Sequence, residues 1–261
     1  MNALERALER LDELEQVAQR HSSPKIDPRV RLITTLLFLG IMLSTPLTQI
    51  EDLILYFVFP ILSARSNGLS YLRIVRRSLI VVPFVGLVAL LNIFYDRTFA
   101  FWLGGIAITR GWITGTALIL RGLLSVQAIL TLIYTTGYYE ICRTLSRLHL
   151  PDVITLQLLF LYRYTHLLVR QAITLRQARS ARSYGRKVYP LKFWGQYIAQ
   201  LFLSTLSRAE KIDQAIVARG FTGRLMPLHA HRGSNPWQDG RYFLIWTSCF
   251  LIIRFLHPTH F

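Results

Sequence analysis

Long apolar runs alternate with polar segments along the whole chain. The runs are between 12 and 23 residues long. A straight transmembrane helix needs roughly 20 apolar residues, so the shorter runs must tilt or include flanking residues. We therefore expect an all-α, polytopic integral membrane protein with about five transmembrane helices. The five runs are 32–44, 53–64, 79–94, 113–135 and 242–256.

The basic residues are distributed unevenly about these runs. If the N-terminus is cytoplasmic and each run crosses once, the segments 1–31, 65–78 and 138–238 share one side and hold 25 of the 30 Lys and Arg residues. The opposite loops hold only Arg97 and Arg110. This positive-inside pattern predicts a multi-pass protein of a bacterial cytoplasmic (inner) membrane with its N-terminus in the cytoplasm. Because the charge follows the membrane, we expect lipid headgroups rather than nucleic acid as its counterpart.

The first twenty residues place apolar side chains at helical spacing among charged ones, which predicts an amphipathic surface helix rather than a signal peptide. The expected organisation has four parts. They are an N-terminal cytoplasmic amphipathic segment (1–31), a transmembrane bundle (32–137), a cytoplasmic helical region (138–238) and a C-terminal transmembrane helix with its tail (239–261).

The region 138–238 contains apolar positions that recur with a helical period among 15 basic and 4 acidic residues. This pattern predicts a short helix near 138–148 followed by two long amphipathic helices, over 156–183 and 201–220, with a turn at 184–195 between them. Each long helix ends in an arginine between small residues, in Ala181-Arg182-Ser183 and in Ala218-Arg219-Gly220. Each arginine continues an apolar stripe: Phe160, Tyr164, Leu168, Leu175 and Ala178 for Arg182, and Phe202, Thr205, Ala209, Ile212 and Ile216 for Arg219.

Two interpretations of these arginines are open. An arginine between small residues can approach another protein closely and form bidentate, charge-assisted bonds with a carboxylate. Alternatively, each arginine complements its own helix dipole and nearby anionic lipid headgroups. The repetition of the same tripeptide pattern at the end of two basic helices favours docking to a protein.

Several motifs lie in a fixed order along the chain, and together they resemble the transmembrane T component of energy-coupling-factor (ECF) transporters of the cobalt/nickel type. Two positions depart from that family: Ser183 stands where glycine is frequent, and Gly137 stands where a proline commonly follows two threonines. The motifs are Ile26-Asp27-Pro28-Arg29-Val30-Arg31-Leu32, the region 108–121, Thr135-Thr136, the region 147–151, Tyr162-Arg163-Tyr164 and the two arginine motifs, the second extending to Gly223.

The resemblance implies a subunit of an ABC-type importer that carries no catalysis of its own. Two coupling helices would carry Arg182 and Arg219 into grooves on two cytoplasmic ATP-binding subunits, and the membrane part would hold a substrate-binding S component. No cofactor is implied in this chain, since ATP and Mg²⁺ would bind the partner ATPases. The implied cargo is a cobalt or nickel ion, with a vitamin as the alternative.

The sequence lacks the usual signs of an enzyme. It has no Gly-x-x-x-x-Gly-Lys-Ser/Thr phosphate loop, no His-Glu-x-x-His zinc motif and no Asp-rich cluster. A membrane-embedded enzyme is the alternative from another class, but it has no recognisable active site. Two histidine pairs, His229 with His231 and His257 with His260, fall on opposite sides of the expected membrane, so we expect no metal site.

Two features in and near the fourth apolar run predict contacts with neighbouring helices. Arg121 lies in the middle of the fourth run, and a charge within a membrane normally pairs with a neighbouring group, here an expected carbonyl or acidic group on another helix. The small residues Gly104, Gly105, Gly111 and Gly115 cluster around the start of that run. They predict close packing between helices.

Overall fold

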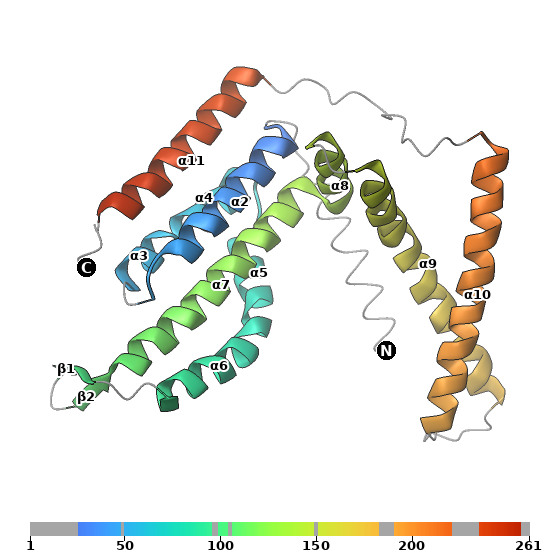
Figure 1. Ribbon diagram of the computed structural model, residues 1–261, viewed down its shortest axis with the longest axis horizontal. Coiled ribbons are helices and arrows are strands. Elements are labelled where there is room, and N and C mark those ends of the chain that lie inside the picture. The colour runs from blue at the N-terminus through green and yellow to red at the C-terminus, as the bar shows by residue number, and fades with distance from the viewer. Residues whose placement is uncertain are drawn as a thin grey trace. The chain divides into compact units, whose positions relative to one another are not determined.

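A computed structural model describes residues 26–47, 50–95, 99–103, 106–148, 151–182, 191–220 and 235–256. These residues are helical apart from one short hairpin, which confirms the expected all-α class (Figure 1). The chain divides into two compact units. Among the described residues, one unit contains 26–141 with 235–256, and the other contains 142–182 with 191–220. Helix numbers follow Figure 1 and begin at α2.

The first unit is a helical bundle. Two of its helical stretches, Tyr71–Tyr95 and Arg110–Thr136, are long and apolar enough to cross a membrane. The element α8 (Tyr138–Arg147) leads out of this unit into the second. The bundle consists of α2 (Pro28–Ser44), α3 (Ile50–Leu55), α4 (Val58–Ser66), α5 (Tyr71–Ser78), the 3₁₀ turn η1 (Leu79–Val81), α6 (Val82–Tyr95), the strands β1 (Phe99–Leu103) and β2 (Ile106–Thr109), α7 (Arg110–Thr136) and α11 (Pro236–Leu256).

The residues Asp27 and Pro28 fix the start of α2. The Asp27 side chain accepts a hydrogen bond from the Arg29 backbone N–H at 2.9 Å, and Pro28 occupies the first helical position, where no N–H is needed. The backbone N–H of Asp27 donates to Oδ1 of Asp239 at 2.9 Å. Since Asp239 lies in the first turn of α11, the same residues join the starts of α2 and α11.

Prolines interrupt two apolar runs that the sequence presented as continuous. The run 53–64 was expected to form one helix, but it divides into α3 and α4 at Tyr56. Pro60 has no N–H for the Tyr56 carbonyl, which instead accepts from Phe59 at 3.3 Å. Pro83 likewise has no N–H for the Leu79 carbonyl, which accepts from the N–H of Val82 instead. The helices α5 and α6 meet at a bend in this region (Figure 1).

The segment between α6 and α7 was expected to be a loop but contains an antiparallel hairpin. The strands β1 and β2 pair with Leu103 opposite Ile106. Their sequences are rich in aromatic and β-branched residues, which favour strands. The intervening dipeptide Gly104-Gly105, which lies outside the described residues, is typical of two-residue hairpin turns.

The core of the bundle is an aromatic cluster between α2, α4 and α11. Phe38 is fully buried, and its ring stacks on Phe59 at a centroid distance of 4.5 Å and lies 5.2 Å from Phe250. Trp246 meets the Phe59 ring edge-on at 4.8 Å. Such aromatic pairs contribute roughly 0.5–1.5 kcal/mol each beyond the area that they bury. The cluster therefore fixes α11 against α2 and α4 near the middle of the bundle.

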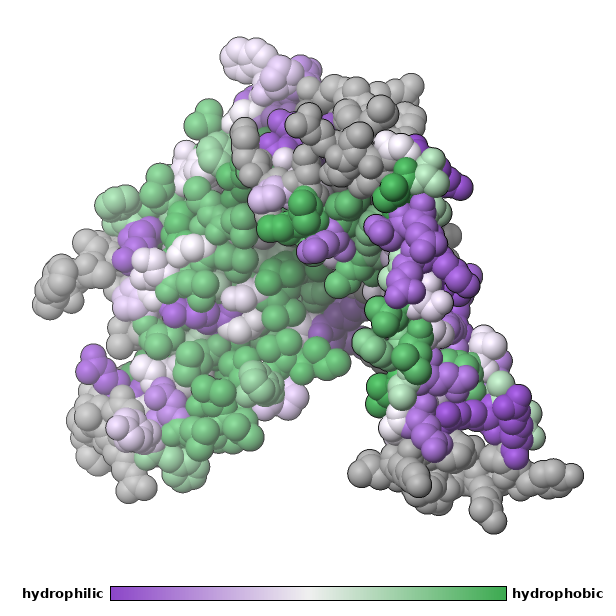
Figure 2. Space-filling view, turned by 45° about the vertical axis from the view of Figure 1, so that its right-hand side comes forward, coloured by the Kyte–Doolittle hydropathy of each residue, from purple (hydrophilic) through white to green (hydrophobic). Residues whose placement is uncertain are grey.

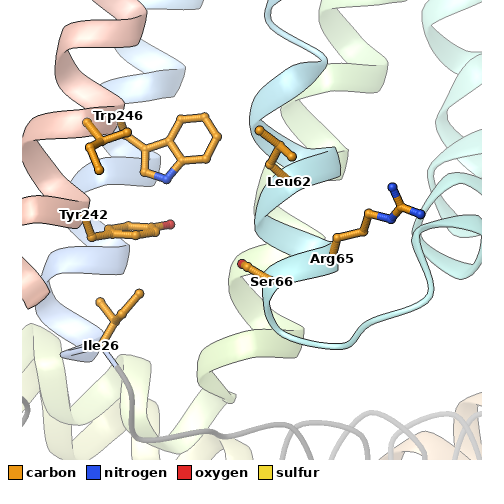
Figure 3. A pocket seen from close by; sticks show the side chains of 7 residues that line it. Ile26, Leu62, Arg65, Ser66, Tyr242 and Trp246 are labelled. Atoms are coloured by element: carbon orange, nitrogen blue, oxygen red, sulfur yellow. The ribbon is translucent and has the colours of Figure 1, made fainter.

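Towards its start, α11 separates from α4 and leaves an open crevice of about 530 Å³. Figure 3 shows Tyr242 and Trp246 of α11 facing Leu62 and Ser66 of α4 across it. The Arg65 guanidinium points away from the crevice (Figure 3). The walls are mainly hydrocarbon, so the crevice offers little to a polar ligand.

The helices α6 and α7 pack closely through glycines. A Cβ atom on Gly115 would lie 3.2 Å from the carbonyl oxygen of Ala89, and one on Gly122 would lie 3.0 Å from Cγ2 of Val85. Gly111 is buried as well. The predicted close packing is thus confirmed for Gly115, whereas Gly104 and Gly105 lie outside the described residues.

Arg121 of α7 has the partner that its position requires. One Nη atom donates to the carbonyl oxygen of Thr45, the residue that caps the C-terminal end of α2. The expectation of a carbonyl partner on another helix is confirmed. A charged donor at a helix C-terminus also interacts favourably with the helix dipole.

The outer surface of the bundle is apolar. Figure 2 shows hydrophobic side chains covering its visible face. On α6 and the turn before it, large side chains such as Ile80, Phe84 and Phe94 are 74%, 75% and 69% exposed. An apolar surface of this kind is typical of contact with lipid or with another membrane subunit.

We predict that Gly115→Ala destabilises the bundle, because the added methyl group would press on the Ala89 backbone and on Ile93. Overpacking of this kind costs about 1–3 kcal/mol. The measurement is the apparent melting temperature of the purified protein in detergent. Gly86→Ala on α6 is the matched control, since no atom lies within 4 Å of its added Cβ. An equal melting temperature for both variants would contradict the packing.

Candidate functional site

The second unit contains two long helices, α9 (Asp152–Arg182) and α10 (Leu191–Ala218), which lie side by side (Figure 1). Each begins directly after a proline, Pro151 or Pro190, a residue that cannot extend a preceding helix. The expectation that α10 begins near residue 201, after a turn reaching Gly195, was wrong. Gly195 is inside the helix, where it costs about 1 kcal/mol relative to alanine but does not break it.

Hydrogen bonds define the register of the pair. The hydroxyl of Tyr197 donates to the Ala172 carbonyl at 2.5 Å, and Nε2 of Gln171 donates to Oγ of Ser204. The Arg179 guanidinium lies 5.6 Å from the centre of the Tyr197 ring. Residues later in α9 therefore face residues earlier in α10, and the two helices are antiparallel.

Tyr197 is suited to its role as a donor. Burial raises the pKa of its phenol, an effect that the positive charges of Arg176 and Arg179 partly oppose. The hydroxyl therefore keeps its proton at neutral pH and can donate to the carbonyl of Ala172.

The apolar stripes predicted from the sequence face each other across an open groove of about 360 Å³. Three residues of the predicted stripes, Leu175, Ala178 and Phe202, lie outside the groove lining. Ala178 is exposed, and so is Phe202, at 62%. The stripes thus serve first to join α9 and α10. The groove is lined by Phe160, Tyr164, Leu167 and Leu168 of α9 and by Thr205, Arg208, Ala209, Ile212, Asp213 and Ile216 of α10.

The two candidate arginines lie where the sequence placed them, at the ends of the helices. Arg182 is the last residue of α9, and Arg219 follows the last residue of α10; both are exposed, as are Ala181 and Ala218. Ser183 lies outside the described residues. The antiparallel register puts the arginines at opposite ends of the pair. Since α10 has 28 residues, the two tips are about 40 Å apart, too far to form one site.

Gly220 has a structural role that the sequence did not reveal. Its φ is +76°, a left-handed conformation that favours glycine, and its N–H donates to the Val217 carbonyl at 2.9 Å. Apart from its chain neighbours, no atom of a described residue lies within 4 Å of the position where a Cβ would be. In this chain Gly220 is therefore needed to end α10, whereas close approach to a partner is a separate expectation.

No group of three or more His, Cys, Asp or Glu side chains comes together among the described residues. The histidines at 229, 231, 257 and 260 lie outside the part of the chain that the structure describes.

A known protein family matches a stretch of the chain that includes most of the bundle and both arginine motifs. The model of the family described as cobalt transport protein, CbiQ, matches residues 19–228. The chain belongs to the cobalt transport protein family. This membership confirms the resemblance to the cobalt/nickel type of T component and identifies the chain as a transport protein.

Two known proteins have sequences similar to that of this cobalt transport family member. The uncharacterized protein MJ1571 of Methanocaldococcus jannaschii is 25% identical over 231 residues, which are 84% of this chain and 77% of that protein. The nickel permease LarQ of Lactiplantibacillus plantarum is 24% identical over 153 residues. This match spans 57% of the chain and about half, 55%, of the permease.

We predict that the double variant Gln171→Cys/Ser204→Cys is joined efficiently by a short thiol crosslinker, because these side chains are hydrogen-bonded across α9 and α10. Cys142 and Cys249 would first be replaced by serine. The control pair, Gln171→Cys/Gln214→Cys, moves the second thiol ten residues, or about 15 Å, along α10 and should not react. Equal crosslinking of both pairs, seen as a mobility shift on a gel, would contradict the register.

Proposed function

We propose that this chain is the energy-coupling transmembrane subunit of an ATP-driven ECF importer for cobalt or nickel ions. It would link two cytoplasmic ATP-binding subunits to a membrane S component that binds the cargo. The observation that carries the proposal is the pair of exposed arginines at opposite ends of one antiparallel helix pair. Membership of a cobalt transport family, and the name of the related nickel permease, support a metal rather than a vitamin as cargo.

The geometry suits a subunit that contacts two partners at once. Two tips about 40 Å apart can occupy two separate grooves, one on each ATPase, whereas tips at one end of the pair could serve only one. Each guanidinium would form bidentate bonds with a carboxylate in its groove. When ATP draws the two ATPases together, both tips would move with their grooves, and the helix pair would transmit this motion to the S component. ATP and Mg²⁺ would remain on the partner subunits.

The bundle supports the proposed membrane-spanning arrangement. Because the starts of α2 and α11 are joined through Asp27 and Asp239, these two helices run in the same direction. Trp237, at the start of α11, is 79% exposed, and Trp112, at the start of the antiparallel α7, is 56% exposed. Exposed tryptophans at both ends of a bundle are typical of membrane interfaces. The N-terminus and the end of α7 would then face the cytoplasm.

We predict that Arg182→Glu and Arg219→Glu each abolish docking to one ATPase, because a carboxylate replaces the guanidinium at the tip. Loss of a central interface arginine should weaken copurification and ATP-dependent metal uptake by more than roughly thirtyfold. Arg170→Glu, an exposed charge reversal in the middle of α9, is the matched control and should stay within about twofold of the unaltered protein. Normal copurification and uptake in both tip variants would refute the proposed docking.

A second pair of variants separates the two roles of Gly220. Asparagine tolerates the left-handed conformation better than alanine does, although its side chain is larger. If the helix end is what matters, Gly220→Asn should bind the ATPase better than Gly220→Ala. If close approach to the ATPase dominates, the order should be reversed. The measurement is the dissociation constant of the ATPase subunit for each variant in detergent.

A further inference from the structure

A buried arginine joins two of the sequence motifs that the arginine tips do not involve. Arg31, in the motif Asp27-Pro28-Arg29-Val30-Arg31, is only 5% exposed. Its Nη1 donates to the Thr135 carbonyl of α7 at 2.8 Å, and its Nη2 donates to Oδ1 of Asn67, in the turn between α4 and α5, at 3.0 Å. One guanidinium therefore connects α2, the end of α7 and the α4–α5 turn.

The carbonyl that Arg31 binds is one that α7 cannot satisfy itself. The last four carbonyls of a helix have no partner further along the helix, and Thr135 is the penultimate residue of α7. A charged donor at this end also complements the helix dipole. Asp239 of α11, which is 8% exposed, adds an electrostatic interaction with Arg31 and accepts the backbone N–H of Asp27. The interaction thus extends to a third helix.

Gly137 directly follows this end of α7 and links it to α8; we call it the glycine joint. Gly137 has φ +79° and ψ 148°, a conformation that is essentially restricted to glycine. Its N–H donates to the Ile133 carbonyl at 2.8 Å and closes α7, and α8 begins at Tyr138. Proline, common here in the family that the sequence resembles, holds φ near −65° and could not adopt this geometry. One residue thus separates the end held by Arg31 from the helix leading to the arginine tips.

We propose that Arg31 is a positioning residue for energy coupling. By holding the last turn of α7 to α2, to the α4–α5 turn and to α11, it makes displacement that arrives through α8 move the bundle as one body. Without it, the last turn of α7 would absorb the displacement at the glycine joint. This inference rests on the proposed function, since it concerns how motion of the tips reaches the membrane part.

The contact requires an arginine. Its planar guanidinium presents separate N–H groups to two acceptors at once, the Thr135 carbonyl and the Asn67 amide oxygen. Lysine keeps the charge but concentrates it at one point, so it can replace only part of this geometry. Methionine has a similar length and removes the charge and all the donors.

The test uses the complete transporter, purified with its ATPase and S subunits and reconstituted into vesicles. The measured quantity is the amount of Co²⁺ or Ni²⁺ taken up per ATP hydrolysed. We expect Arg31→Met to lower this ratio roughly tenfold and Arg31→Lys about threefold, with unchanged copurification of the ATPases. Arg29→Met is the matched control. Nε of Arg29, in the same motif, has no hydrogen-bond partner among the described residues, and the ratio should stay within about twofold.

Several outcomes would overturn the inference. One is a proportional fall of uptake and ATP hydrolysis in Arg31→Met, which would indicate a structural role alone. Another is an unchanged ratio in that variant. If Arg31→Met fails to assemble, an unchanged ratio in Arg31→Lys has the same meaning. Failure of the proposed function is distinguishable, because the unaltered chain would then copurify with no ATPase or transport metal independently of ATP.

Discussion

The bundle depends on arginines that donate to the ends of neighbouring helices. Near the start of α2, Arg31 binds the Thr135 carbonyl at the end of α7; in the middle of α7, Arg121 binds the Thr45 carbonyl at the end of α2. Two antiparallel helices therefore satisfy each other's C-terminal ends. In an apolar surrounding an unsatisfied carbonyl costs several kcal/mol, and a buried guanidinium without acceptors costs more. Each contact lowers both costs, which helps to accommodate two charges among apolar helices.

The two units are held together by different kinds of contact. The bundle is held by buried aromatic rings, by glycine contacts between α6 and α7 and by the arginine contacts. The pair α9 and α10 is joined by a hydroxyl, an amide and an open apolar groove. Within the bundle unit, four residues before its boundary at Ile141, the chain passes through Gly137, whose positive φ ends α7. In the proposed mechanism, a change of backbone direction at Gly137 would leave the hydrogen bonds within α7 intact while Arg31 holds the end of that helix.

The local sequence pattern predicted a large part of this arrangement. The helical spacing of apolar residues and the residue types at helix ends both depend on residues that are close together in the sequence. The apolar stripes of α9 and α10, and the position of Arg182 and Arg219 at their ends, followed from spacing alone. What depends on another helix could not be read in the same way. The sequence indicated that Arg121 needs a carbonyl or an acid, but not that Thr45 supplies it. The break at Tyr56 has a local cause in Pro60, which reasoning from the length of the apolar run overlooked.

The structure also changes the meaning of the small residues beside the arginines. From sequence, alanine and glycine next to Arg219 indicated space for a partner. The left-handed φ of Gly220 shows that glycine is already required to end α10, so its presence alone is weak support for docking. The stronger argument is geometric. The two exposed guanidinium groups lie about 40 Å apart at opposite ends of the helix pair, so one acceptor among the described residues cannot hold both. Under the proposed function, each charge would dock on a separate partner subunit.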